Sequence, residues 1–223
     1  MNIALIGYGK MGHALEGIAN ERGHSVVCTI DTAEQWAERA AALRNAQVAI
    51  EFTTPQTAAE NLLRCLDLGL PVVCGTTGWY ERYDEIAAHC RQCGGAMLTA
   101  TNFSLGMNLM FALNERLDEL MARHPNYHVS INETHHIHKL DAPSGTAITL
   151  RNQLHRSDVP IESIREGEVP GTHTVRYDSE EDTLLITHEA HSRRGLALGA
   201  ILAAEWLVGR TGVFTMKDVI DSE

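Results

Sequence analysis

A short apolar run stands directly before three closely spaced glycines at the start of the chain. Residues 2–6 are apolar apart from Asn2, and Gly7, Gly9 and Gly12 follow with the spacing G-x-G-x-x-G. Apolar residues then recur every three or four positions from residue 11 to residue 19, which is the pattern of one helix face. This order predicts a buried strand, a tight turn and an amphipathic helix.

The alternation of short apolar runs with amphipathic segments continues through the first hundred residues. Further strands are expected at 26–30, 48–52, 71–74 and 96–100. Helical spacing of apolar residues predicts helices near 36–43, 58–68 and 80–90. Because continuous apolar strands are buried on both faces and alternate here with helices, we expect an α/β fold with a doubly wound, Rossmann-like parallel sheet.

The pattern changes after residue 104. We expect one longer helix over 105–121, a helix over 145–154, and strands at 127–134, 172–177 and 183–189. Consecutive strands joined by a turn pair antiparallel, which predicts a smaller α+β domain with an open mixed sheet. The last helix, 196–207, could belong to either part, and we place it with the first. The predicted domains are residues 1–104 with 194–223, and residues 105–193.

The composition excludes several classes of protein. The 223 residues are 44% hydrophobic and 21% charged, as in soluble globular proteins. With 18 basic and 29 acidic residues and a formal net charge of −11, the chain is a poor partner for nucleic acid or an anionic membrane. The amino terminus lacks the basic segment of a secretory signal, and the longest apolar stretch, 196–208, is interrupted by Glu205. We therefore expect a cytoplasmic protein.

The glycine motif and a later carboxylate together indicate a dinucleotide site. Three glycines at this spacing permit a tight turn and a close approach of the backbone to a pyrophosphate at the helix N-terminus. Asp31 ends the second predicted strand, where a carboxylate can accept a hydrogen bond from a ribose hydroxyl. The same carboxylate repels a 2′-phosphate, so NADH is expected in preference to NADPH, although Lys10 could offset part of this bias. A plain strand-to-helix turn remains the alternative.

Two further loops follow predicted strands of the same sheet. They are Gly75-Thr76-Thr77 and Thr99-Ala100-Thr101-Asn102. Ligands of open parallel sheets bind beyond the carboxyl ends of the strands, which favours a cofactor role for both loops. Taken singly, each could be a simple connection.

The segment from Glu133 to Thr146 carries the densest group of chemically active side chains. Alternation along a strand puts Glu133 and His135 on one face and sends His136 to the other, unless the strand ends between the two histidines. Ser144 is expected to cap a helix and to leave the amides of Gly145 and Thr146 exposed to an anion.

Three interpretations of this segment are open. Zinc could be bound by His135, His136 and His138, although no matching ligand set stands at a familiar spacing. The histidines could instead mark an exposed strand end. In the third interpretation, which we favour, positive charge and helix amides hold an anionic substrate and one titratable group delivers a proton. Lys139 suits that step because, unlike the fifteen arginines, a lysine can give up a proton.

The whole segment closely resembles the signature of the 4-hydroxy-tetrahydrodipicolinate reductase family. The matching residues are Glu133-x-His135-His136-x-x-Lys139-x-Asp141-Ala142-Pro143-Ser144-Gly145-Thr146-Ala147. The resemblance extends to the amino-terminal glycine motif and to Gly75-Thr76-Thr77-Gly78, Asn102-Phe103-Ser104, Arg165-Glu166-Gly167, Gly171-Thr172-His173-Thr174, Ile186-Thr187-His188 and Ser192-Arg193. It implies reduction of a cyclic dicarboxylate by NAD(P)H with loss of water, a step of lysine and diaminopimelate biosynthesis.

The resemblance also implies roles for individual residues. His135 would donate or accept a proton, Lys139 would donate one, and His136 with the amides of Gly145 and Thr146 would bind substrate, without a metal. Cofactor-binding residues would be Gly7, Tyr8, Gly9, Lys10, Met11, Gly12, Asp31, Gly75, Thr76, Thr77, Thr99, Ala100, Thr101 and Asn102. The first domain would bind the dinucleotide, and the second would bind substrate and assemble a homotetramer.

The sequence departs from the family pattern at a few positions, and other functions remain in competition. Glu51 stands where Asp is usual, and Lys10 where Arg is common. An NAD-dependent amino-acid dehydrogenase would share the glycine loop without needing the histidine and lysine cluster, and a cofactor-sensing regulator would bind NAD(H) without chemistry. Cys90 and Cys93 have the C-x-x-C spacing, for which a structural role is favoured over a redox role.

Overall fold

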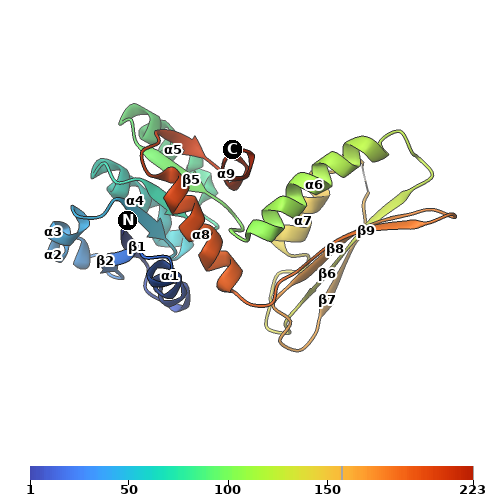
Figure 1. Cartoon of the computed structure of the whole chain (residues 1–223), viewed down its shortest axis with the longest axis horizontal. Helices are drawn as coiled ribbons and strands as arrows, with labels where there is room; N and C mark the ends of the chain where they lie inside the picture. The colour runs from blue at the N-terminus through green and yellow to red at the C-terminus, as the bar shows by residue number, and fades with distance from the viewer. Residues whose placement is uncertain (157, 223) are drawn as a thin grey trace. The chain divides into compact units, whose positions relative to one another are not determined.

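The computed structural model describes residues 1–156 and 158–222 (Figure 1). The chain divides into two compact units, Met1–Ser104 with the residues from Leu196 onward, and Leu105–Gly195. The predicted boundary after residue 193 lies two residues before the one observed. Ser157 and Glu223, which the predicted domain ranges include, lie outside the described residues.

The first unit contains the predicted doubly wound parallel sheet. Its strands in the described residues are β1 (Asn2–Ile6), β2 (Ser25–Ile30), β3 (Val48–Glu51), β4 (Val72–Cys74), β5 (Ala96–Thr99) and β10 (Gly212–Phe214). All pairs are parallel, in the order β10-β5-β4-β3-β1-β2. Strand order reverses direction at β1, so the loops after β1 and β3 lie at the position where doubly wound sheets bind ligands.

The helices of the first unit follow the predicted alternation, with local differences. They are α1 (Lys10–Glu21), α2 (Gln35–Glu38), α3 (Ala40–Leu43), α4 (Pro55–Asp67), the 3₁₀ turn η1 (Tyr80–Arg82), α5 (Tyr83–Gln92), α8 (Arg194–Leu207) and α9 (Met216–Asp221). The single helix expected at 36–43 is divided at Arg39, whose guanidinium donates to the Thr29 carbonyl and hydroxyl oxygens at 2.6 Å. Strand β10 and helix α9 were not predicted. None of the helices in the described part of the chain combines the length and apolar character needed to cross a membrane.

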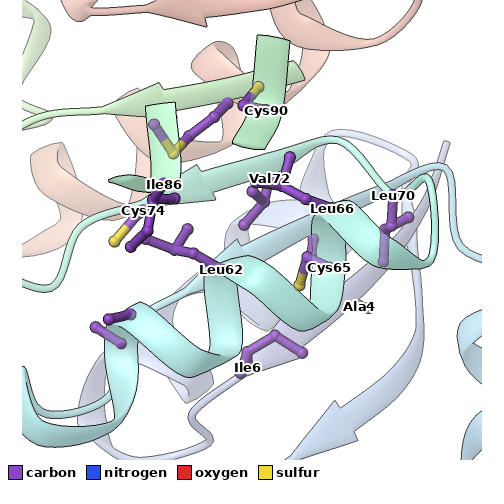
Figure 2. Packing of buried hydrophobic residues seen from close by; sticks show 14 of the residues in the cluster. Ala4, Ile6, Leu62, Cys65, Leu66, Leu70, Val72, Cys74, Ile86 and Cys90 are labelled. Carbon is purple, nitrogen blue, oxygen red and sulfur yellow. The ribbon is translucent and has the colours of Figure 1, made fainter. Parts of the chain in front are cut away.

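Alternate residues of the strands build two separate cores, one on each face of the sheet. Ala4 and Ile6 of β1 pack with α4 and α5, whereas Ile3 and Leu5 pack with α1, α8 and α9. Figure 2 shows the first of these cores, in which the apolar side of α4 faces the strands. The period of two along each strand accounts for this division.

Helix α8 fixes the segment that follows β5 by direct backbone contact. A Cβ atom at Gly199 would lie 1.6 Å from the carbonyl oxygen of Phe103. Only glycine therefore allows this approach, and it holds the segment after Thr99 against the helix.

The second unit contains the predicted open mixed sheet, and its helices pack on one face. The strands are β6 (His128–His135), β7 (Ile161–Arg165), β8 (Thr172–Asp178) and β9 (Thr183–Glu189), and the helices are α6 (Leu105–Met121) and α7 (Gly145–Asn152). The order is β7-β6-β8-β9, in which β6 and β7 are parallel and the other pairs antiparallel. Strand β7 was not predicted. Residues of α6 and α7 share a core with Ile131 and Tyr177, which covers one face of the sheet (Figure 1).

Candidate functional site

The glycine turn after β1 is shaped by backbone contacts that leave no space for side chains. Gly7 has φ +94°, and a Cβ atom there would lie 2.0 Å from the Phe52 carbonyl oxygen. A Cβ atom at Gly12 would lie 2.6 Å from the Gly7 carbonyl oxygen. Helix α1 begins directly after Gly9, so the amides of its first turn have no partners within the helix and suit an anion.

Asp31 and the glycine turn are joined directly. The Tyr8 amide donates a hydrogen bond to Asp31 Oδ1 over 2.6 Å. The second carboxylate oxygen can therefore accept from a ribose hydroxyl while the first holds the turn.

Two cavities bring most of the predicted cofactor residues together. One of about 530 Å³ is lined by Gly7, Gly9 and Asp31 among others. A second of about 400 Å³ is lined by residues of three loops, including Gly9, Lys10, Met11, Gly75, Thr76 and Thr77. Phe52 and Thr53 line both cavities. The loops after β1, β3 and β4 therefore form one continuous surface.

The loop after β4 is held in place by its neighbours. The Thr53 amide donates to Thr76 Oγ1 over 2.8 Å, and Trp79 Nε1 donates to the Thr76 carbonyl oxygen over 2.8 Å. A Cβ atom at Gly75 would lie 2.1 Å from the Phe52 ring. The loop after β4 is therefore fixed against the loop after β3.

Other predicted cofactor residues lie near these cavities without lining them. Thr99, Ala100, Thr101 and Asn102 follow β5, the neighbour of β4, and line neither cavity, and the same holds for Tyr8 and Gly12. Asn102 Oδ1 accepts from the Ser104 amide over 2.8 Å, which stabilises the turn.

The structure adds two residues that the sequence did not single out, and it shows the surroundings of Glu51. Trp36 and Arg64 line the same cavity as Asp31, and the Arg64 guanidinium lies over the Trp36 ring, 5.4 Å from its centroid. Glu51 is fully buried and accepts hydrogen bonds from Thr53 Oγ1, from Cys74 Sγ at 3.1 Å and from Asn61 Nδ2 at 3.4 Å. Arg64 stands on α4, far along the chain from Asp31, so no local pattern marked it.

In the second unit, strand β6 ends at His135, between the two adjacent histidines. The predicted alternation is confirmed, because Glu133 and His135 are buried on the covered face. The Glu133 carboxylate contacts His135 Nδ1 and accepts from Arg165 Nη2 at 2.9 Å and from the Ser144 amide at 3.3 Å. The alternative of an exposed strand end is therefore wrong for His135, although His138 is exposed and pairs with Glu168 at 3.3 Å.

Lys139 lies in a short loop that Arg165 supports. Lys139 Nζ is 2.7 Å and 3.0 Å from the two carboxylate oxygens of Asp141. Arg165 donates from Nε to the Lys139 carbonyl oxygen at 3.4 Å and from Nη2 to the Asp141 carbonyl oxygen at 2.5 Å. The loop is therefore tied to β7 through its backbone.

The start of α7 completes a small carboxylate-binding arrangement. Ser144 caps the helix as predicted, since its Oγ accepts from the Ala147 amide over 3.2 Å. The Asp141 carboxylate accepts hydrogen bonds from Lys139, and this contact leads the effects that lower its pKa, to which the nearby Gly145 backbone also contributes. Lys139 and the helix start thus already hold a carboxylate, which is that of Asp141.

A second buried histidine stands beside His135. The His173 ring is 5.0 Å from the His135 ring, edge to face, and its Nε2 is 3.2 Å from Ser144 Oγ. Burial, followed by the charge of a protonated His135, lowers the pKa of His173 to about 4. Burial also lowers the pKa of His135, although Glu133 acts in the opposite direction. Both rings are therefore neutral at pH 7.

The structure does not bring together the three histidines of the zinc interpretation. In the part of the chain that the structure describes, Glu133, His135 and His173 are the histidine and carboxylate side chains whose donor atoms converge, within 4.8 Å of one another. Glu133 already faces the Arg165 guanidinium, and His173 faces Ser144. These contacts describe a hydrogen-bonded network rather than the alternative of a zinc site made by His135, His136 and His138.

All five cysteines are free thiols, and none is paired in the described structure. Burial, and then the neighbouring Cys93, raise the pKa of Cys90 to about 11. A thiol that stays protonated at neutral pH is a poor nucleophile, which favours a structural role for Cys90 over a redox role.

Comparisons with known proteins agree with this arrangement. The family description "Dihydrodipicolinate reductase, N-terminus" matches residues 1–103, and "Dihydrodipicolinate reductase, C-terminus" matches residues 106–220. The chain is 43% identical over 235 residues to the 4-hydroxy-tetrahydrodipicolinate reductase of Christiangramia forsetii, covering 99% of this chain and 98% of the relative. It is 33% identical over 222 residues to that of Thermosipho africanus, with coverage of 99% and 98%.

A solved structure shows the same fold. The dipicolinate-bound dihydrodipicolinate reductase from Paenisporosarcina sp. TG-14 matches with a TM-score of 0.80 at 20% identity, over 98% of each chain. The C-terminal family match runs through α8 to residue 220, whereas the residues from Leu196 onward pack in the first unit.

The low pKa of His173 predicts a pH-dependent contribution to stability. In the unfolded chain His173 takes up a proton near pH 6.5, whereas in the folded chain it does so only near pH 4. Between these two pH values the unfolded state binds more protons, so the free energy of unfolding decreases as the pH falls. We expect His173→Asn to gain about 3 kcal/mol relative to the unsubstituted chain between pH 7.5 and pH 4. Urea unfolding at a series of pH values measures this change, with His138→Asn as an exposed control. If the difference in free energy of unfolding between His173→Asn and the unsubstituted chain did not change with pH, the low pKa of His173 would be contradicted.

Proposed function

The chain belongs to the dihydrodipicolinate reductase family, and we propose that it performs the reaction of that family with the residues described above. The enzyme reduces 4-hydroxy-tetrahydrodipicolinate to tetrahydrodipicolinate with loss of water, in lysine and diaminopimelate biosynthesis. The observation that carries the assignment of residues is the carboxylate held between Lys139 and the start of α7, beside buried His135.

The first unit suits the dinucleotide that the reaction requires. NAD(P)H supplies the hydride when it is bound. The amides at the start of α1, with the turn from Gly7 to Gly12, would hold its pyrophosphate, and Asp31 would hold its ribose. The fit is supported by Gly7 and Gly12, where a Cβ atom would collide with backbone, so the turn stays tight and free of side chains at these two positions. Gly75–Thr77 line the cavity on the next strand, and Thr99–Asn102 extend the same edge of the sheet.

The second unit suits a dicarboxylate. Lys139 now binds the Asp141 carboxylate near the Gly145 backbone, and a substrate carboxylate would take the same place. Thr146 in the first turn of α7 and His136 next to the strand end extend the polar surface around that position. Because Asp141 is exposed, its carboxylate can be displaced without leaving a buried charge unpaired.

Proton transfer is assigned to Lys139 and His135. Electron density moves toward the ring nitrogen of the substrate as the hydride arrives, and a cation beside that nitrogen stabilises the developing charge. Lys139 supplies both this charge and a proton. His135 is neutral at pH 7 and can exchange a proton at the same site.

Replacement of Lys139 tests the reaction and its acid together. We expect Lys139→Ala to retain NADH binding and to lose turnover of the cyclic dicarboxylate by about 10²-fold or more, because the general acid is removed. Lys139→Arg keeps the charge but not the proton, so it should stay slow as well. NADH oxidation with freshly generated substrate measures both, and exposed Lys217→Ala serves as the control.

Two results would contradict this assignment. Wild-type turnover by Lys139→Ala would show that another group donates the proton. Binding of NADH by the unsubstituted chain without any turnover of the dicarboxylate would favour a cofactor sensor, and turnover of an amino acid would favour an amino-acid dehydrogenase.

We also propose that NADH is preferred to NADPH, because Asp31 repels a 2′-phosphate. Arg64 lines the same cavity and can partly neutralise that phosphate, so NADPH should remain usable. We expect Asp31→Asn to raise the ratio of kcat/KM for NADPH over NADH about tenfold, and Arg64→Met to lower it. Steady-state rates with both cofactors measure the ratio, and Asp67→Asn, at the far end of α4, is the control. An unchanged ratio in both variants would place the 2′ position elsewhere.

A homotetramer assembled through the second unit is the further proposal that rests on the family. It is supported by apolar side chains on the uncovered face of its sheet, since Leu185 is 54% exposed and Ile164 is 40% exposed. We expect sedimentation equilibrium to give four times the chain mass of 24.5 kDa, and Leu185→Asp to give smaller species. Leu68→Asp, equally exposed at 54% in the first unit, should leave the mass unchanged. A monomer at all concentrations would overturn the proposal.

A further inference from the structure

We propose that Glu133 and Arg165 are a pair of positioning residues for the catalytic groups: Glu133 fixes the ring proton of His135 on Nδ1, and Arg165 joins the same carboxylate to the loop that carries Lys139. The inference rests on the proposed function, and it adds two residues to which the resemblance gave no role.

The first step of the argument is the burial of Glu133. Its side chain has 0% exposure, although it carries a carboxylate. A buried carboxylate is strongly unfavourable unless charged or polar partners surround it. Burial alone would raise the pKa of Glu133, but the hydrogen bond from Arg165 leads the opposing effects and the pKa is lowered overall. The group is therefore ionised at neutral pH.

An ionised carboxylate only accepts hydrogen bonds, which decides the tautomer of His135. The contact between Glu133 Oε2 and His135 Nδ1 requires the ring proton to lie on Nδ1. Since the ring is neutral at pH 7, the lone pair of Nε2 is free to accept a hydrogen bond.

The surroundings of Nε2 agree with this assignment. A Cβ atom at Gly171 would lie 3.0 Å from His135 Nε2, so glycine at this position keeps the space next to the nitrogen open. Gly171 also has φ +149°, a conformation that residues with side chains rarely adopt.

Arg165 connects the two catalytic residues. In the parallel pairing of β6 and β7, Arg165 stands opposite His135, and its side chain therefore lies on the same face as Glu133. Nη2 bonds Glu133 Oε1 at 2.9 Å and the Asp141 carbonyl oxygen at 2.5 Å, while Nε bonds the Lys139 carbonyl oxygen at 3.4 Å. A lysine carries one nitrogen and could not make this set of contacts.

The start of α7 is joined to the same carboxylate. The Ser144 amide donates to Glu133 Oε1 over 3.3 Å. A single buried carboxylate thus relates the orientation of His135, the loop of Lys139 and the helix that presents Gly145. Removal of the Glu133 carboxylate should therefore impair proton transfer more than cofactor binding.

Glu133→Gln is the direct test, because a glutamine can donate to Nδ1 and no longer requires a proton there. The groups that face His135 are Glu133 on β6, Lys139 on the following loop, Arg165 on β7 and His173 on β8. Removal of the Glu133 charge should lower the pKa of His135 further. The part of the pH profile of kcat that reports protonation of His135 should therefore shift to lower pH. We expect kcat to fall about tenfold or more, with KM for NADH unchanged.

The tautomer is measured by ¹⁵N NMR of sedimented protein labelled on the histidine rings, with His135 assigned from the signals that disappear in His135→Gln. We expect the proton of His135 to leave Nδ1 in Glu133→Gln and to stay there in Glu162→Gln. Glu162 is an exposed carboxylate on β7 that bonds Asn132, so it is a matched control in the same sheet. The same tautomer, pH limb and kcat in both variants would overturn the proposal.

Arg165→Lys keeps the test decisive if Glu133→Gln does not fold. It retains a positive charge beside Glu133, so His135 should keep its proton on Nδ1, while kcat falls about tenfold because the Lys139 loop loses its two backbone bonds. Wild-type kcat in Arg165→Lys would overturn the role of Arg165. Failure of the unsubstituted enzyme to oxidise NADH with the cyclic substrate would overturn the proposed function alone, since the NMR measurement does not depend on turnover.

Discussion

Close approach of backbone segments at the carboxyl edge of the parallel sheet is the constraint on which the first unit depends. The carbonyl oxygen of Phe52 lies where a side chain of residue 7 would begin, and the Phe52 ring lies where one of residue 75 would begin. Buried Glu51 accepts hydrogen bonds from Thr53, in the same loop, and from Asn61 on α4. Because side chains are excluded at Gly7, Gly12 and Gly75, the backbone at these positions can approach a pyrophosphate closely.

The second unit depends on a different constraint, which is the need to satisfy a buried negative charge. Glu133 requires donors, and they come from His135 at the strand end, from Arg165 on β7 and from the amide of Ser144. Asp141 places a second carboxylate at the surface of the same cluster, between Lys139 and Gly145. The buried Glu133 carboxylate is hydrogen-bonded to His135, Arg165 and Ser144 and so positions these residues. The Asp141 carboxylate is exposed and can be displaced by a ligand.

Much of the fold and part of the site could be predicted from local patterns. The continuous apolar runs of β1, β3, β4 and β5 correctly indicated strands buried on both faces, and Ser144 was correctly predicted to cap α7. Strand β7 was missed because three of its five residues are polar, without regular alternation, and none of the five is fully buried. The helix expected at 36–43 is divided because Arg39 turns to bond Thr29, a contact that helical spacing does not reveal.

The sequence by itself determined most of the strands and several turns and helix starts, because these depend on neighbours within a few positions. Examples are the spacing of Gly7, Gly9 and Gly12, the alternation that buries Glu133 with His135, and the cap at Ser144. Only the tertiary structure decided which distant side chains join them. Arg64 reaches the cavity of Asp31 because α4 packs across the sheet, and Arg165 reaches Glu133 because the register of β6 and β7 places it opposite His135. Apolar periodicity specifies that a strand is buried, but strand order and register arise from the packing of the whole unit.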